Sequence, residues 1–162
     1  GPTNGDPNTF MFAFGGVGGA PIAAPCAAEP TPGPGDIVGT SGADRLSGTS
    51  GPDRIFGLGG NDKITGVGDD DVIYGGDGDD KITGNVGADL LCGGAGRDNL
   101  AGSGGNDKLF GGGDNDDLAG GDGDDALWGE GGDDRLAGGG GTNTNDGGAG
   151  TNTCSRPSIC SS

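Results

Sequence analysis

Residues 57–83 read GLGGNDKIT, GVGDDDVIY and GGDGDDKIT, three consecutive units of nine residues that share one pattern. Each unit begins with Gly, carries Asp at its sixth position and carries Ile at its eighth position. The same phase extends outward without an insertion, so that residues 39–137 divide into eleven such units with Leu or Ile at the eighth position. Two degenerate units follow in the same phase over residues 138–155. A period held over this length predicts a repeat architecture in which each unit packs mainly against its neighbours.

These units resemble the G-G-x-G-x-D-x-U-x nonapeptides of the RTX (repeats-in-toxin) family, a repeat that binds calcium. The resemblance covers residues 39–137 closely and residues 138–155 loosely. It implies an all-β fold, a right-handed parallel β-roll of 18-residue coils, in which six residues of each unit turn and three form a short strand. We therefore expect an extended N-terminal arm and linker in residues 1–35, the β-roll in residues 36–155 and a C-terminal disulfide cap in residues 156–162.

The residue types within the unit suit a hard cation. Glycine permits turns with positive φ and a close backbone approach, which can place carbonyl oxygens around an ion. Calcium takes about six to eight oxygen ligands, and the sixth-position carboxylate adds charge to such a set. The predicted calcium ligands are Asp44, Asp53, Asp62, Asp71, Asp80, Asp89, Asp98, Asp107, Asp116, Asp125 and Asp134.

Because two units complete a coil, each turn stacks on the turn two units later, and the aspartates fall into two columns. The gaps between successive turns in these columns give about nine calcium sites. The eighth-position Leu and Ile side chains point inward and form a small core. Since the chain also has a formal charge of −17, we expect calcium binding to drive folding.

The ninth positions follow a second period, two units long, which the nonapeptide does not require. Alternate units carry small residues there, from Ser47 to Ala137. The other units form an apolar ladder on the opposite face, which consists of Phe56, Tyr74, Cys92, Phe110 and Trp128. An exposed apolar strip of this length is more often covered or used in binding than left open.

The N-terminal arm is a candidate cover for this ladder. It holds the chain's other three aromatic residues and is followed by a Pro- and Gly-rich linker, AAEPTPGPG, in residues 27–35. The predicted interface consists of Phe10, Phe12, Phe14, Phe56, Tyr74, Phe110 and Trp128. The sequence leaves open whether the arm packs on its own roll or on that of a neighbouring molecule.

The four cysteines form an even set, which indicates an oxidising compartment. Three pairings are possible. We predict that Cys26, in the arm, pairs with Cys92, the cysteine of the ladder. Cys154 and Cys160 are close enough in sequence for a loop disulfide that caps the roll, and free or interchain thiols remain the alternative.

The composition argues against several classes of function. Asp and Glu number 25 against 8 Lys and Arg, which disfavours nucleic acid and anionic membranes as partners. No apolar run approaches the length of about 20 residues that a membrane span needs. The chain has no His and no Cys beside a base, so we expect it not to be an enzyme. The acidic, calcium-suited composition and the cysteines point to a secreted, extracellular or cell-surface location.

Two function classes remain open. The first is a secreted structural protein that folds on binding calcium and self-associates, through its arm and by end-to-end stacking, into a filament or matrix. The alternative is a monomeric extracellular calcium-binding module whose aromatic face binds a glycan or a protein partner.

Overall fold

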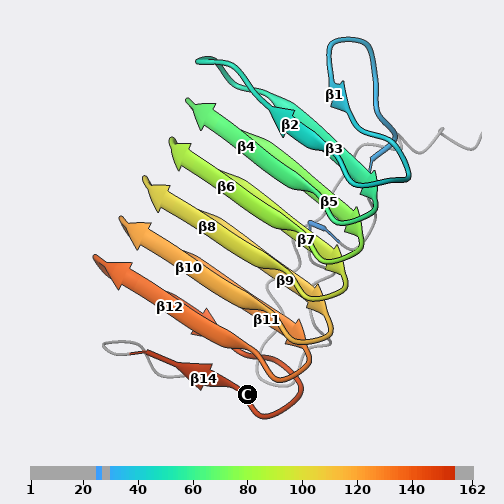
Figure 1. Ribbon diagram of the computed structural model, residues 1–162. Coiled ribbons are helices and arrows are strands. Elements are labelled where there is room, and N and C mark those ends of the chain that lie inside the picture. Colours follow the sequence, from blue (N-terminus) through green and yellow to red (C-terminus); the bar gives the residue numbers. More distant parts are fainter. Residues whose placement is uncertain (1–24, 27–29, 156–162) are drawn as a thin grey trace, which may run out of the picture.

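The computed structural model describes residues 25–26 and 30–155, and this part of the chain is all-β. Its fourteen strands form two parallel sheets of seven strands each. The odd sheet has the order β1-β3-β5-β7-β9-β11-β13, and the even sheet has the order β14-β12-β10-β8-β6-β4-β2. The chain alternates between the sheets, so two strands and two turns complete one coil (Figure 1). The predicted parallel β-roll is therefore confirmed.

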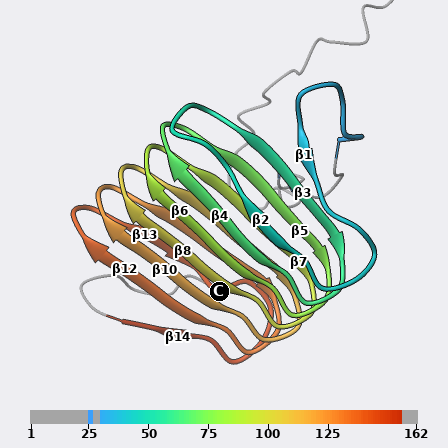
Figure 2. The same ribbon diagram turned by 45° about the horizontal axis from the view of Figure 1, so that its top comes forward.

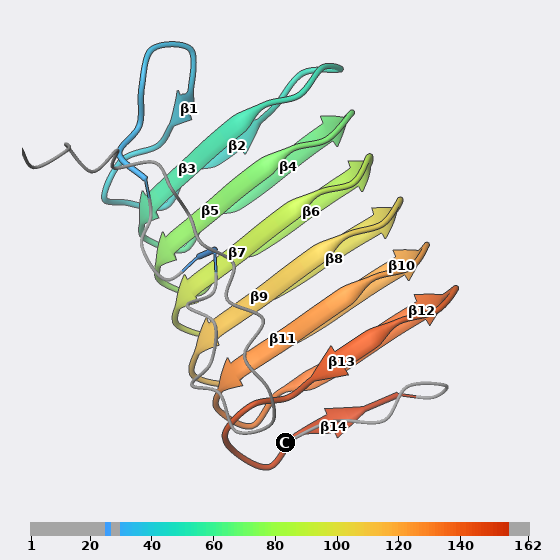
Figure 3. The same ribbon diagram turned by 180° about the vertical axis from the view of Figure 1, so that it is seen from behind.

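The coils stack in sequence order, as the opposite views of Figures 1 and 3 show. The odd sheet contains β1 (Ile37–Val38), β3 (Arg54–Gly59), β5 (Val72–Asp77), β7 (Leu90–Ala95), β9 (Lys108–Gly113), β11 (Ala126–Gly131) and β13 (Thr144–Asp146). The even sheet contains β2 (Arg45–Ser47), β4 (Lys63–Gly68), β6 (Lys81–Val86), β8 (Asn99–Gly104), β10 (Asp117–Asp122), β12 (Arg135–Gly140) and β14 (Thr153–Cys154).

The strands are longer than the resemblance implies. From β3 to β12 each strand has six residues rather than three, and each intervening turn has only three. The extension is possible because the second residue of each unit takes a positive φ, such as 75° at Leu58 and 105° at Val67. Pairing then resumes beyond the first-position Gly, where Leu58 aligns with Gly76 and Gly59 with Asp77. The backbone bends within the strand without losing its pairing with the neighbouring strands.

The core lies between the sheets and consists of the eighth-position side chains. These residues are at most 1% exposed from Ile55 to Leu136, and Ile37, Leu46 and Cys154 pack against them at the two ends. Cys154 aligns with Leu136 and so takes an eighth position in the last coil. Figure 2 shows the flattened coils, with one sheet on each side of this core. Each buried Leu or Ile contributes about 1.5–3 kcal/mol, which makes a thin core for a chain of this charge.

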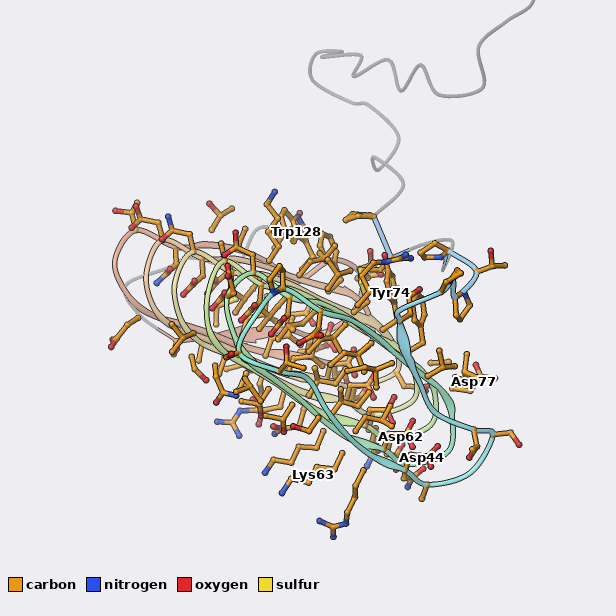
Figure 4. All side chains as sticks on the ribbon, turned by 90° about the horizontal axis from the view of Figure 1, so that it is seen from above. Asp44, Asp62, Lys63, Tyr74, Asp77 and Trp128 are labelled. Carbon is orange, nitrogen blue, oxygen red and sulfur yellow. A yellow bond between two sulfur atoms is a disulfide. The ribbon has the colours of Figure 1, made fainter. Side chains whose placement is uncertain are left out.

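The outward faces of the two sheets differ, as the two-unit period predicts. Figure 4 shows Tyr74 and Trp128 on one side of the coil and Lys63 on the other. In the odd sheet, Phe56 stacks on Tyr74 with ring centroids 5.1 Å apart, and Phe110 stacks on Trp128 at 4.4 Å. Phe56, Tyr74 and Phe110 are at most 6% exposed, so the ladder is covered at these residues, whereas Trp128 at its end is only partly buried.

The predicted Cys26–Cys92 disulfide is present, with the two Cα atoms 5.6 Å apart, and Cys26 packs against the cluster of Phe56, Tyr74 and Cys92. Cys154 is also disulfide-bonded. The partner of Cys154, the cap in residues 156–162 and arm residues 1–24 lie outside the described residues, so the interface roles of Phe10, Phe12 and Phe14 and the pairing of Cys160 stay predictions.

Candidate metal centre

The sixth-position aspartates end the turns, directly before the strands. Nine of them, from Asp62 to Asp134, are at most 3% exposed, an unusual burial for carboxylates. Successive turns lie over one another at each edge of the roll, and Figure 4 shows Asp44 and Asp62 close together at one such edge. The structure thus brings the predicted ligands into two columns, with Asp44 and Asp53 at the half-buried first turns.

One oxygen of each buried aspartate connects neighbouring coils without any metal. The backbone N–H of Asp62 donates to Oδ1 of Asp80 at 2.7 Å, and the N–H of Asp89 donates to Oδ1 of Asp107 at 2.9 Å. The same bond joins successive turns along both columns. Oδ1 is therefore a structural acceptor for the preceding coil.

The other oxygen, Oδ2, has a different environment. It is buried and has no hydrogen-bond donor in Asp62, Asp71, Asp89, Asp98, Asp107, Asp116, Asp125 and Asp134. A buried polar atom without a hydrogen-bond partner costs about 1–3 kcal/mol of folding free energy, and a charged one costs more. A repeated cost of this kind indicates that a cation completes the turn.

The first-position glycines provide the space beside this oxygen. A Cβ on Gly102 would overlap Oδ2 of Asp107 and lie 2.7 Å from the carbonyl oxygen of Gly120. None of the described first-position glycines has a positive φ, which instead falls at the second and fourth positions. Glycine thus has both of the expected roles, but at different positions. The first Gly is needed because the carboxylate and the next coil approach it closely, and the positive φ values fall at the second and fourth positions.

The surroundings of Oδ2 fit calcium. No group of three or more acidic, His or Cys side chains in the described residues is arranged to hold a metal ion. Backbone carbonyl oxygens lie beside Oδ2, as that of Gly120 does next to Gly102 and Asp107. Calcium accepts carbonyl and carboxylate oxygens in flexible geometry, whereas zinc and other softer metals need His or Cys. The chain has no His, and the three described cysteines, Cys26, Cys92 and Cys154, are all disulfide-bonded.

Burial also makes the metal-free carboxylates weak acids. It raises the pKa of Asp98 to about 8 and that of Asp116 to about 7, with further contributions from neighbouring carboxylates in the column. The pKa values of Asp71 and Asp107 rise to about 6 for the same reasons. In each case the N–H bond to the carboxylate opposes the rise. At neutral pH these turns therefore need a counter-charge, supplied by a proton or a metal ion.

The turns at the two ends differ from the interior turns. At the N-terminal end, the N–H of Thr40 donates to Oδ2 of Asp44 at 2.6 Å, and its hydroxyl donates to the same atom at 2.9 Å. In the two C-terminal turns Asn143 and Asn152 replace the aspartate. The sequence predicts ordinary calcium ligands at Asp44 and Asp53 and degenerate repeats at the C-terminal end. Thr at the second position and Asn at the sixth position are the residues that distinguish these end turns in the sequence.

A second connection between coils runs through the fifth position, which the nonapeptide motif leaves unspecified. The N–H of Asp79 donates to Oδ1 of Asn61 at 3.1 Å, and the N–H of Arg97 donates to Oδ1 of Asp79 at 3.0 Å. In these bonds the N–H of one coil donates to a side chain of the preceding coil. At the sixth position the N–H donates to a side chain of the following coil. The sequence contained a signal, since Asn or Asp recurs at the fifth position of many units.

Comparison with protein families agrees with this geometry. The family model described as the RTX calcium-binding nonapeptide repeat matches four times, over residues 38–73, 65–100, 93–127 and 120–154. No curated protein matches the chain. In the part that the structure describes there is no helix able to cross a membrane. The four matches together span most of the sequence, with the buried aspartates inside them, and the chain therefore belongs to the RTX family of calcium-binding nonapeptide-repeat proteins.

Proposed function

We propose that this is a secreted, non-catalytic structural protein whose β-roll forms when about nine calcium ions bind, and which self-associates outside the cell. The observation that carries the proposal is the row of buried Oδ2 atoms without donors. About nine divalent ions would also neutralise the formal charge of −17. Without them, carboxylates one coil apart repel one another over the whole length of a thin core.

The experiment that tests calcium-dependent folding is a far-UV circular dichroism titration. In excess EDTA we expect the β signal to be lost, because the metal-free carboxylates at neutral pH oppose burial. Millimolar calcium should restore it, and equal magnesium should not, since Mg²⁺ holds its water and needs stricter octahedral geometry. A β signal that survives complete chelation would remove the proposal.

The extracellular location is supported by the Cys26–Cys92 disulfide, because such bonds persist in oxidising compartments. Calcium is also abundant there, so a protein that folds on calcium would reach its folded state after export. Expression with and without an export signal, followed by thiol labelling under denaturing conditions, tests this: the exported protein should contain no free thiols.

Self-association is supported by the ends of the roll. The terminal strands of the two sheets are β1, β2, β13 and β14, and beyond them no further strand of the described chain pairs with the sheets. Open parallel edges are templates for pairing with another molecule. Size-exclusion chromatography and negative-stain microscopy in millimolar calcium should reveal assemblies that grow with concentration, and a monomer at every concentration would contradict this part of the proposal.

A partner-binding module is the second candidate, and it ranks lower. A glycan-binding aromatic surface needs open ring faces, whereas Phe56 is fully buried and Phe110 is 5% exposed. Trp128 is only partly buried, so a smaller contact at that end of the ladder is the version that the geometry favours. Quenching of Trp128 fluorescence by candidate oligosaccharides would identify it.

A further inference from the structure

The two C-terminal turns have the same backbone conformation as the interior turns. Gly139 and Gly141 take positive φ values of 93° and 87°, at the second and fourth positions, as Gly76 and Gly78 do at 106° and 125°. The bond between coils is also kept, because the N–H of Asp125 donates to Oδ1 of Asn143 at 2.8 Å. The change from Asp to Asn at the sixth position therefore affects only the other terminal atom of the side chain, which is Oδ2 in Asp and Nδ2 in Asn.

That atom is a donor in Asn143 and an acceptor in the interior aspartates. Nδ2 of Asn143 donates to the carbonyl oxygens of Gly139 and Gly140, at 3.3 and 3.2 Å. Nδ2 of Asn152 donates likewise to the carbonyl oxygen of Gly148 at 3.3 Å. In these turns the amide N–H groups of Asn143 and Asn152 donate hydrogen bonds to the backbone carbonyls. In a turn with a buried aspartate, a bound cation would interact with those carbonyls instead. An Asn turn is complete without metal.

The N-terminal turns reach the same result from the opposite direction. There the aspartate is retained, but Oδ2 of Asp53 accepts from the N–H of Thr49 at 2.6 Å and from its hydroxyl at 3.0 Å. Thr40 and Asp44 form the same pair of bonds. Both aspartates are partly exposed, and their second oxygens are already satisfied by the chain. A cation at these turns would displace two donors instead of relieving a buried charge.

We propose that Thr40, Thr49, Asn143 and Asn152 terminate the calcium columns, so that ions occupy only the turns of the nine buried aspartates from Asp62 to Asp134. The inference rests on the proposed calcium-dependent folding and makes it specific. It also revises the predicted ligand set and the way the sites are counted. Asp44 and Asp53 become hydrogen-bonded end turns, and the nine ions are one for each turn with a buried aspartate, no longer one for each gap between eleven turns. The outermost coils are then held by hydrogen bonds of the chain itself, and the ions lie between them.

Native mass spectrometry in calcium tests the C-terminal limit by counting bound ions. The wild type should hold nine, Asn143→Asp should hold one more, and the double variant Asn143→Asp/Asn152→Asp should hold two more, because each change turns an internal donor into an acceptor beside the same carbonyls. The matched control is Asn99→Asp, which adds the same charge at an exposed strand position and should leave the count unchanged.

The converse substitution tests the amide as a replacement for the ion. Asp107→Asn should lower the count by one and raise the fraction of β-roll that circular dichroism detects in EDTA, because one interior turn no longer needs a cation. Asp77→Asn removes an equal charge from an exposed strand position and is the control. Equal effects of the two variants in EDTA would mean that only net charge matters, which contradicts the inference.

The outcomes separate this inference from the proposed function. A wild type that binds no calcium, or whose fold ignores it, overturns both. A wild type that folds on calcium but holds more than nine ions, or a folded Asn143→Asp/Asn152→Asp variant with no extra ion, overturns only the limits placed at the ends. If Asn143→Asp/Asn152→Asp does not fold, the single variant Asn143→Asp and the loss of one ion in Asp107→Asn decide the question.

Discussion

The odd and even sheets are built from the same nonapeptide and share the same inner row of Ile and Leu, yet their outer faces have little in common. The odd sheet carries stacked aromatic rings, a disulfide and a salt bridge between Arg54 and Asp36 at 3.2 Å. The even sheet carries small residues beside exposed Lys and Arg side chains such as Lys63. The one-unit period therefore specifies the roll, and the two-unit period specifies which face is covered.

The ninth position offers the most direct way to break this comparison. Phe56 is fully buried in the odd sheet, and Thr65 takes the same place in the even sheet. With calcium saturating, Phe56→Ala should lower the free energy of unfolding by about 3–5 kcal/mol. Thr65→Ala should change it by less than about 0.5 kcal/mol. Urea unfolding followed by circular dichroism measures both, and similar losses would mean that the two faces are equivalent.

The disulfide sharpens the comparison, because it closes a loop with a sequence separation of 66 residues on the odd face only. Cys26→Ala/Cys92→Ala should destabilise the calcium-bound protein by about 2–4 kcal/mol, because the unfolded chain gains freedom and because Cys26 loses its hold on the cluster of Phe56, Tyr74 and Cys92. Hydrogen exchange should show the greater loss of protection in β3, β5 and β7, next to the cluster that Cys26 contacts. A uniform loss over all coils would argue against a local role.

The turns on the two sides should also titrate differently. Asp98 and Asp116, with pKa values of about 8 and 7, lead into even strands, whereas Asp71 and Asp107, at about 6, lead into odd strands. A carboxyl whose folded pKa is raised stabilises the fold at a pH below its ordinary value, 3.8, and loses that contribution as the pH rises through the folded pKa. The calcium-free chain should therefore be most ordered near pH 4 and lose order toward pH 8.

This pH dependence has a test on each side of the roll. In calcium-free buffer, Asp98→Asn should flatten the circular dichroism profile from about pH 4 to pH 8, and Asp107→Asn only from about pH 4 to pH 6. In the presence of calcium the direction reverses, because protons compete with the ion for the same oxygens. Identical profiles for both variants would show that the two columns share one environment.

The smallest expected effect concerns two arginines at seventh positions. Arg54 lies 5.2 Å from the ring centroid of Phe56 and is paired with Asp36, whereas Arg135 lies 4.0 Å from Asp117 with both side chains exposed. Arg54→Ala should cost about 0.5–1 kcal/mol. Arg135→Ala should cost close to nothing, since exposed pairs are weak. Thermal unfolding in high calcium resolves the difference, and a larger loss for Arg135→Ala would reverse the assignment.

Most of the architecture followed from the sequence because the repeat makes the pattern redundant. Because eleven units share one phase, the positions of residues such as Asp62 and Leu118 in the coil can be assigned even if one unit departs from the pattern. The β-roll, the columns of aspartates, the inward Ile and Leu and the pairing of Cys26 with Cys92 are all present.

The details that the sequence did not yield depend on individual atoms. The strand continues through Val67 at a φ of 105°, which no propensity for a β-branched residue would suggest. In the sequence, Asn143 in place of an aspartate such as Asp125 looks like the loss of the consensus residue. The hydrogen-bond distances show that the substitution replaces an acceptor with a donor. The bonds of the fifth position were hidden because the motif assigns that position no residue.

The register of the stacked coils has a consequence for how the chain tolerates insertions and deletions. Removal of two consecutive units, such as 93–110, takes out one whole coil and leaves every later side chain on its original face. Removal of a single unit, such as 57–65, keeps the nonapeptide phase but moves all following units to the other sheet. Cys92 would then stand on the face opposite Cys26, and the aromatic ladder would divide between the two sides. Insertions and deletions that keep both faces intact should therefore come in whole coils of two nonapeptides, although the sequence motif is a single nonapeptide.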